Sequence, residues 1–315
     1  GEISAEKADD MHRQQHSTHE GKRRFAVIAD SGADISDEDL ERLDIHMVPC
    51  RIQFGDHGYL DKLSITIDEF YEELASNPAH PTTSQPAPGD FRRQFQFLAS
   101  HFDDVISINL TSVASGTYEA ARLAASRTNA PGRIHVVDSR NASMGQGMLA
   151  VLAAECAAAG LDAETTVAAV QAQVPDTTSY AILKDTRYAV RGGRLPKWVR
   201  TIGELLRLNP IIYTRADGKV SLSGFLLGRH NRIERFARYV AKRAPRGPIE
   251  IGIGHASCEE DALQLEQHLR RLVPEISKLV VNGLGPALGV HGGPGTLLVA
   301  VRPWVSAQDV ARGSD

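Results

Sequence analysis

The chain has 315 residues, of which 42% are hydrophobic and 23% are charged, the balance of a globular protein rather than a disordered one. No apolar run reaches the ~20 residues that a membrane-crossing helix needs, and the most apolar stretch, Met148 to Ala159, is interrupted by Glu155. The three cysteines have no metal-ligand spacing, which disfavours a disulfide-rich or zinc-stabilised fold and indicates a reducing, cytoplasmic compartment.

The net charge of −4 conceals an uneven distribution. Between Lys184 and Arg246 there are 16 Lys and Arg against 4 Asp and Glu, a local net charge of +12, and the remainder of the chain carries −16. A basic block of this size indicates an acidic or phosphate-bearing partner, the alternative being a solvated face with ion pairs. Nucleic acid is disfavoured because the block lacks interleaved aromatic residues and no helix-turn-helix or zinc pattern occurs.

Residues 1–24 are polar, carry three histidines and lack the apolar core of a signal peptide, so we expect a tail or linker there. The first residue is Gly rather than Met. A tag remnant, a processed end and a cut edge of a longer polypeptide are therefore all open.

From residue 25 to about 175, short apolar segments alternate with helical ones. We expect strands at 25–29, 47–54, 104–109 and 133–137, with helices between them, including one from Ser143 to Ala159. This alternation predicts a parallel sheet covered by helices on both faces. Three of the strands end in Asp30-Ser31, Thr111-Ser112 and Asp138-Ser139, on the sheet edge where open α/β folds bind ligands.

A run of prolines and hydroxyl residues spans positions 81–89, with the sequence PTTSQPAPG. Proline disfavours helix and central strand, so we expect a stiff loop whose hydroxyl groups are held out of regular secondary structure. Such a loop suits the oxygen-rich head group of a ligand. An ordinary surface turn is the alternative, and the polar strand ends favour the ligand site.

From residue 176 the pattern changes to a hairpin with a turn at Asp217-Gly218 and further strands and helices, one opened by a Ser257/Glu260 capping box. It predicts a mixed sheet with helices on one face. The sequence thus predicts an α/β protein with a polar tail or linker at 1–24, an N-terminal α/β/α sandwich domain at 25–175, a C-terminal two-layer α+β domain at 176–305, and a tail at 306–315.

Six motifs in one order carry a resemblance to a known family: Ala29-Asp30-Ser31, the 81–89 run, Ser115-Gly-Thr-Tyr118, Val137-Asp-Ser139, Arg191-Gly-Gly-Arg194 and His291-Gly-Gly-Pro-Gly295. From about Phe25 to Trp304 the chain resembles the DegV family, the fatty-acid-binding subunits of bacterial fatty acid kinase. The family's Asp-Ser-Thr/Ser-Ala/Cys-Asp run has glycine, Gly32, in third position here, so no direct ligand role is expected for that residue.

The resemblance implies a DegV-like fold and a bound long-chain fatty acid, whose carboxyl group would be held by Thr83, Ser84, Ser112, Ser115, Gly116 and Thr117. It implies a separate kinase subunit, similar to dihydroxyacetone kinases, that uses ATP to phosphorylate the acid to an acyl phosphate for phospholipid synthesis. Arg229 (or Arg232) and His291 would assist this transfer, and Arg191, Arg194 and Arg232 would dock the kinase. No cofactor or metal is expected, and the kinase could be a missing N-terminal part of the same polypeptide.

Two other classes of function stay open. A self-sufficient hydrolase or phosphotransferase could act on a small acid at the same hydroxyl residues, although Gly-x-Ser-x-Gly is absent. A DNA-binding regulator could use the basic block. The glycine-rich stretch around His291 could cradle a phosphate, and its spacing is not that of a dinucleotide fingerprint. Because no Gly-x₄-Gly-Lys-Ser/Thr motif occurs, the substrate-presenting subunit is favoured.

Overall fold

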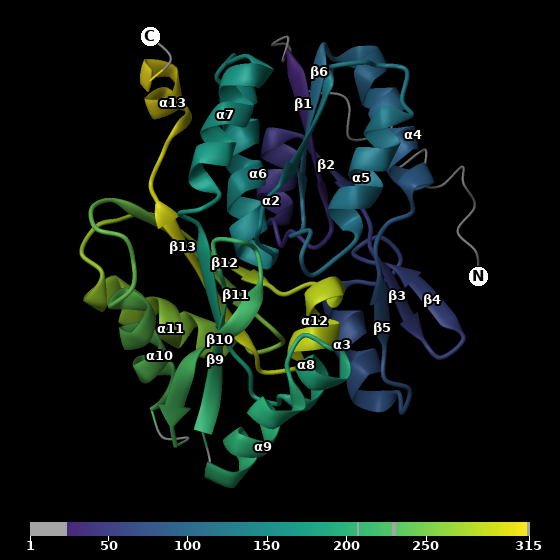
Figure 1. Cartoon of the computed structure of the whole chain (residues 1–315). Coiled ribbons are helices and arrows are strands. Elements are labelled where there is room, and N and C mark those ends of the chain that lie inside the picture. Colours follow the sequence, from purple (N-terminus) through teal and green to yellow (C-terminus); the bar gives the residue numbers. More distant parts are fainter. Residues whose placement is uncertain (1–23, 207, 229–230, 314–315) are drawn as a thin grey trace.

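The computed structural model describes residues 24–206, 208–228 and 231–313, so residues 1–23 of the tail expected at 1–24, and Arg229, lie outside the described residues. The strands form a four-stranded parallel sheet, a six-stranded mixed sheet and a small three-stranded antiparallel sheet (Figure 1). Among the described residues, no helix is long and apolar enough to cross a membrane.

The parallel sheet has the strand order β2-β1-β6-β7 and is covered on both faces, as the sequence predicts. Along β1, Phe25, Val27 and Ala29 pack into one core and Ala26 and Ile28 into another, because successive side chains point to opposite faces. The strands are β1 (Phe25–Asp30), β2 (Ile45–Val48), β6 (Asp104–Asn109) and β7 (Ile134–Asp138). One face is covered by the helices α2 (Asp37–Leu43), α6 (Ser143–Ala158) and α7 (Ala163–Gln173). The other face is covered by α4 (Pro88–His101) and α5 (Thr117–Ser126).

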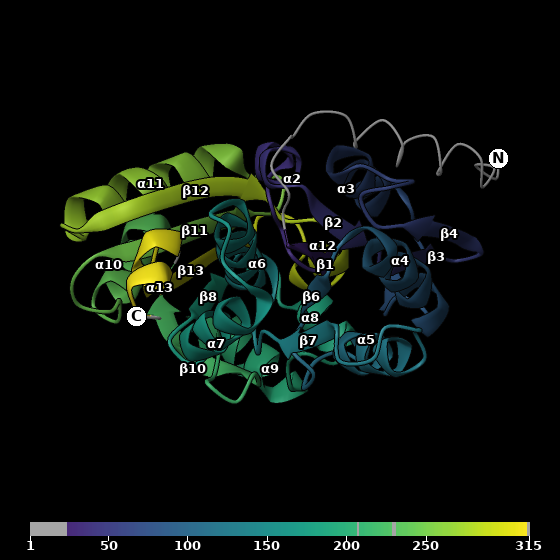
Figure 2. The ribbon, with the colours of Figure 1, turned by 90° about the horizontal axis from the view of Figure 1, so that it is seen from above.

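Helix α6 lies between the parallel sheet and the mixed sheet (Figure 2). Every residue from Ser143 to Ala154 is buried, which a helix covered on one side only would not show. Met144 and Met148 pack against Ala300 in the mixed sheet. A Cβ atom at Gly252 of that sheet would lie 2.9 Å from Met144 Cβ, so glycine allows the close approach of helix and strand.

The mixed sheet has the strand order β10-β9-β8-β13-β11-β12, in which only the pair β11/β12 is parallel. Two helices cover one face, and two further helices follow β8 near β9. The elements are β8 (Thr178–Ile182), α8 (Arg187–Arg191), α9 (Lys197–Leu206), β9 (Leu208–Thr214), β10 (Val220–Leu227), α10 (Arg232–Ala241), β11 (Ile249–His255), α11 (Glu259–Leu272), β12 (Ile276–Gly283) and β13 (Leu297–Pro303).

The small sheet joins the two halves of the chain. Its strands, in the order β4-β3-β5, are β3 (Arg51–Phe54), β4 (His57–Leu60) and β5 (Thr82–Ser84), and the helix α3 (Ile67–Ser76) packs beside them. Their core is shared with residues near the C-terminal end, including those of helix α12 (Pro286–Gly292). The Tyr71 hydroxyl, for example, donates a hydrogen bond of 3.0 Å to the carbonyl of Leu284.

Four local expectations are corrected by the structure. The strand expected at 47–54 is two strands in different sheets, divided at Pro49-Cys50. The 81–89 run is not wholly irregular, because Thr82–Ser84 pair with β3 as a short edge strand. Helix α11 has Cys258 as its N-cap residue, without a side-chain cap. Ser257 has a left-handed φ of 50° and lies before the helix, so the expected capping box does not form.

The fourth correction concerns the C-terminal residues expected as a tail. Residues Ala307–Gly313 form helix α13, and its Val310 is buried in the core that contains α6. The missed signal is local: the backbone N–H of Ser306 donates to Asp309, and Asp309 N–H donates back to Ser306 Oγ. The chain therefore returns to the N-terminal half. The division at 175 stays a prediction.

Candidate functional site

A cavity of about 260 Å³ lies between the N-terminal and C-terminal halves of the chain. This volume is far above the ~10–15 Å³ that a single water needs, so the cavity is of ligand size. Most of its lining is apolar and comes from both halves: Leu110, Ala142, Ala181, Leu183, Ala189, Ile212, Val220, Leu284, Ala287, Leu288 and Leu298. The surface suits an aliphatic group that spans the two halves.

The polar lining comes mainly from four parts of the chain. Strand β5 and the residue after it supply Thr83, Ser84 and Gln85, the approach to α5 supplies Ser115 and Gly116, and the C-terminal half supplies Arg194 and His291. The carboxyl ends of β1, β6 and β7 face the same region, because parallel strands end at one edge of their sheet. We call Thr83, Gln85, Ser115, Arg194 and His291 the polar cluster.

The polar cluster is linked across the sequence by a hydrogen bond of 3.0 Å between Thr83 Oγ1 and His291 Nε2. Burial, with smaller contributions from Arg194 and His80, lowers the pKa of His291 to about 4, so the ring is neutral at neutral pH. Within the described part of the chain, the other ring nitrogen, Nδ1, is buried without a hydrogen-bond partner. The proton position on the ring therefore depends on Thr83 and on any bound ligand.

Arg194 ties the C-terminal half to the loop before α5. Its guanidinium donates to the carbonyl of Gly192 at 2.5 Å and to the carbonyl of Ala114 at 3.1 Å. Burial lowers the pKa of Arg194, although the group stays charged at neutral pH. Since no carboxylate among the described residues forms an ion pair with it, Arg194 adds net positive charge to the polar cluster.

Helix α5 begins beside this positive charge. Ser115 Oγ lies 2.8 Å from Thr117 Oγ1 and accepts the backbone N–H of Thr117 at 3.3 Å. A Cβ atom at Gly116 would lie 2.8 Å from Gln85 Nε2, so the glycine lets the amide side chain approach the helix start. The N-terminus of a helix favours a negative group, which adds to the anion preference of the polar cluster.

The structure does not bring together all the head-group residues predicted from the sequence. Thr83, Ser84, Ser115 and Gly116 line the cavity, Thr117 is buried behind Ser115, and Ser112 is exposed outside the lining. The residue before it, Thr111, lines the cavity instead and donates to the carbonyl of Gly218 at the hairpin turn. The two residues are 107 positions apart, so the sequence could not indicate their contact. The polar end of the strand was the one sequence feature that pointed to Thr111.

The predicted docking arginines do not line a common site. Arg194 is in the cavity lining, Arg191 lines a second, smaller cavity, and Arg232 lies 3.4 Å from Asp261 with a mostly buried side chain. No group of three His, Cys, Asp or Glu side chains able to hold a metal occurs in the part of the chain that the structure describes.

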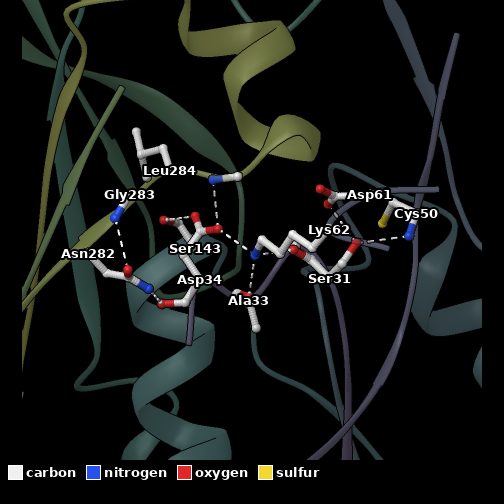
Figure 3. Close-up of polar contacts among 12 residues, drawn as sticks. Ser31, Ala33, Asp34, Cys50, Asp61, Lys62, Ser143, Asn282, Gly283 and Leu284 are labelled. Atoms are coloured by element: carbon white, nitrogen blue, oxygen red, sulfur yellow. Dashed lines mark hydrogen bonds and ion pairs between the residues drawn. The ribbon is translucent and has the colours of Figure 1, made fainter. Parts of the chain in front are cut away.

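A buried polar network fixes the mutual position of the two halves beside the cavity (Figure 3). Asp34 accepts Lys62 Nζ at 2.7 Å, Ser143 Oγ at 2.6 Å and the backbone N–H of Gly285 at 2.9 Å. Ser31 Oγ donates to Asp61 at 2.6 Å and accepts the backbone N–H of Cys50, a lining residue, at 2.8 Å. The sequence motif Asp30 to Asp34 thus supports the cavity without lining it.

The glycine in the third position of that motif has a spatial reason. A Cβ atom at Gly32 would lie 2.7 Å from Asp30 Oδ1 and 3.0 Å from Leu110 Cδ1. Asp30 Oδ1 accepts the backbone N–H of Gly32, and Oδ2 accepts that of Leu110. Gly32 therefore permits the closed turn in which Asp30 holds the end of β6.

Comparison with known proteins gives one consistent family. The model of the DegV family, described as an uncharacterised protein family, matches residues 24–303. A DegV domain-containing protein of Caldanaerobacter subterraneus is 32% identical over 272 residues, covering 86% of this chain and 96% of that protein. Protein DegV of Bacillus subtilis is 30% identical over 276 residues, covering 87% and 97%.

Solved structures give the same result. A DegV family protein from Thermus thermophilus, described by its fatty acid binding, has a TM-score of 0.81 and 28% identity, covering 89% of this chain and all of that one. DegV from Bacillus subtilis, described as a fatty acid binding protein, has a TM-score of 0.79 and 28% identity, covering 90% of this chain and all of that one.

Proposed function

This chain belongs to the DegV family, and from that membership and the cavity we propose that it binds a long-chain fatty acid. The observation that carries the proposal is a ligand-sized cavity with an extensive apolar lining and a single polar cluster. A fatty acid has the same division into one polar end and one long apolar tail. The fatty acid binding described for the proteins from Thermus thermophilus and Bacillus subtilis supports this choice.

The apolar lining would supply most of the affinity. Each CH₂ group removed from water contributes about 0.8 kcal/mol, so a tail of about fifteen such groups gains roughly 12 kcal/mol before the costs of association. The carboxyl group then needs only to be oriented. Residues from the small sheet, the mixed sheet and α12 line the cavity, so chain-length preference depends on the two halves jointly.

The polar cluster would hold the carboxyl group. When the His291 ring carries its proton on Nε2, that N–H donates a hydrogen bond to Thr83 Oγ1, and the Thr83 hydroxyl is free to donate to a carboxylate oxygen. Ser84, Ser115 and the start of α5 add donors. A bidentate arginine would stabilise the carboxylate against attack on phosphate, whereas neutral hydroxyl donors leave it more reactive.

We further propose that the protein presents this acid to an ATP-using kinase subunit that forms an acyl phosphate. The absence of a Gly-x₄-Gly-Lys-Ser/Thr motif and the +12 block between Lys184 and Arg246 support this reading. Arg191, Arg194 and Arg232 would dock the kinase, and Arg229 and His291 would assist the transfer. The three free cysteines fit a reducing cytoplasm.

A second candidate, a self-sufficient hydrolase, has one observation in its favour. The 3.0 Å contact between Thr83 and His291 has the geometry of a nucleophile and its base. Against it, a ring with a pKa of about 4 is a weak base, and in the described ranges no carboxylate orients its Nδ1. Hydrolysis of a test ester, lost in Thr83→Val, would favour this candidate.

Native mass spectrometry of freshly purified protein, followed by denaturation, tests the fatty-acid proposal. We expect a released long-chain fatty acid, and after delipidation we expect Thr83→Val to bind the acid about fivefold to tenfold more weakly, the effect of one lost hydrogen bond. Thr82→Val is the matched control, because Thr82 is the exposed neighbour in the same strand and lies outside the lining. A wild-type protein that stays empty after incubation with fatty acids would overturn the proposal.

A further inference from the structure

A second cavity, of about 180 Å³, lies between helix α8 and the loop that leads into β5. Its lining is largely polar and includes His80, Arg187 and Arg191, and none of its lining residues is acidic. The acidic side chains at its edge are already engaged: Asp185 pairs with Arg187, and Glu73 accepts Asn77 Nδ2 at 2.6 Å. The cavity therefore has room and positive charge for a small anion.

Two of its groups lack the partners that buried or charged donors normally have. His80 Nε2 is shielded from solvent and has no hydrogen-bond partner in the part of the structure that is described. Arg191 forms no ion pair or hydrogen bond with any residue in the described ranges, whereas Arg187, one turn earlier, is held by Asp185 at 2.5 Å. The buried His80 nitrogen is costly to leave without a partner, whereas the exposed Arg191 guanidinium is accessible to an anion from solvent.

The second cavity adjoins the polar cluster through the same two segments of chain. Thr83 lies three positions after His80, and Arg194 lies three positions after Arg191. The second member of each pair lines the first cavity. The His80 ring lies against the Tyr188 ring, with centroids 5.8 Å apart and planes tilted by 41°, and Tyr188 also lies against Gly293, close to His291. An anion held by His80 and Arg191 would thus lie next to the carboxyl end of the proposed fatty acid.

We propose that this second cavity is a phosphate site, in which Arg191 and His80 bind the oxygens of a phosphoryl group. Arginine is suited to phosphate because its planar N–H groups contact two oxygens at once. The phosphate could be inorganic or part of an acyl phosphate; assigning it to the acyl phosphate rests on the proposed function, but the site itself does not.

Titration of the full-length protein with inorganic phosphate at constant ionic strength tests this site, with histidine-labelled NMR as the readout. We expect the His80 signals to shift with phosphate concentration, and the His80 pKa, which burial and Arg191 lower in the free protein, to rise. Arg191→Gln should weaken binding about tenfold or more. Arg271→Gln, an exposed arginine on α11, is the matched control and should bind as the wild type does.

Fatty-acid content, measured in parallel, separates the two proposals. Phosphate binding lost in Arg191→Gln while the fatty acid is retained supports the second site. If phosphate leaves His80 unchanged in the wild type, or binds Arg191→Gln equally well, the phosphate site is refuted whatever the fatty-acid content. A long-chain alkyl phosphonate distinguishes the two phosphate sources. If it binds more tightly than inorganic phosphate, and if both Thr83→Val and Arg191→Gln weaken its binding, the site is that of an acyl phosphate. If the two ligands bind with equal affinity, the site is that of free phosphate.

Discussion

At the scale of single residues, His291 combines burial with an unsatisfied ring nitrogen. Its folded-state pKa of about 4 lies below the ordinary value of about 6.5. Between these two values the unfolded chain binds a proton that the folded chain does not. The stability that depends on the neutral ring is therefore complete above pH 6.5 and is lost as the pH falls toward 4.

We predict that replacing His291 with Asn removes part of the pH dependence of unfolding. The His291 contribution to the free energy of unfolding should fall by about 3 kcal/mol between pH 6.5 and pH 4, from the pKa difference. Asp61 acts in the opposite direction, because burial raises its pKa to about 6 and acid then favours the folded state. Urea unfolding of the wild type and of His291→Asn at several pH values gives the His291 contribution as the difference between their free energies of unfolding. If the two free energies fall in parallel as the pH is lowered, the prediction is contradicted.

At the scale of elements, glycines at the C-terminal ends of α8 and α12 allow these two helices to pack closely. A Cβ atom at Gly192 would lie 2.2 Å from His291 Nδ1, and one at Gly293 would lie 2.3 Å from Tyr188 Cδ2. Gly192 has ordinary backbone angles (φ −72°, ψ −4°), so space rather than conformation requires glycine there. The position of His291 relative to Thr83 thus depends on how closely the two helices pack.

We predict that Gly192→Ala displaces His291 from Thr83 and destabilises the fold by about 1–3 kcal/mol, the usual cost of overpacking. Fatty-acid binding should weaken together with stability. Gly89→Ala is the matched control, because a Cβ atom there meets nothing within 4 Å and alanine favours the helix. Unfolding curves and histidine NMR spectra check both variants, and a His291 signal unchanged in Gly192→Ala would count against the steric argument.

Regular elements were largely predictable from local patterns. The apolar segments at 25–29 and 104–109 gave two strands of the parallel sheet, and the polar strand ends pointed to the edge that carries the site. The division of 47–54 between two sheets was missed, although Pro49, which cannot donate a hydrogen bond to a neighbouring strand, marks the break. Only tertiary pairing decides that the second segment joins a different sheet. Likewise, local patterns could not indicate that Arg194 reaches Ala114, 80 residues away.

At the scale of the whole molecule, Asp34 connects the first loop to both the small sheet and the C-terminal half. It is fully buried, and its partner Lys62 is largely buried as well. The Asp34 carbonyl also accepts Asn282 Nδ2 at 3.3 Å (Figure 3). Removing the carboxylate would leave the largely buried Lys62 charge with only the carbonyls of Ser31 and Ala33 and the neighbouring Asp61 to compensate it.

We predict that Asp34→Asn lowers the free energy of unfolding by about 3–5 kcal/mol, the usual cost of breaking a buried ion pair. Asp56→Asn, in the exposed turn of the small sheet, is the control and should change stability by less than about 0.5 kcal/mol. A double-mutant cycle with Lys62→Met measures the coupling directly. Additive effects of the two substitutions would show that the ion pair contributes no coupling energy to the fold.

The residues that line the main cavity extend from Cys50 to Leu298 along the chain. Contacts so distant in sequence form late in folding, so the cavity exists only when nearly the whole chain has reached its native arrangement. A ligand of this cavity binds the native state alone and stabilises it by mass action, by about 2.7 kcal/mol at a hundredfold excess over Kd. The amount of ligand supplied during synthesis would therefore influence how much of the protein accumulates and how well it resists heat and proteolysis.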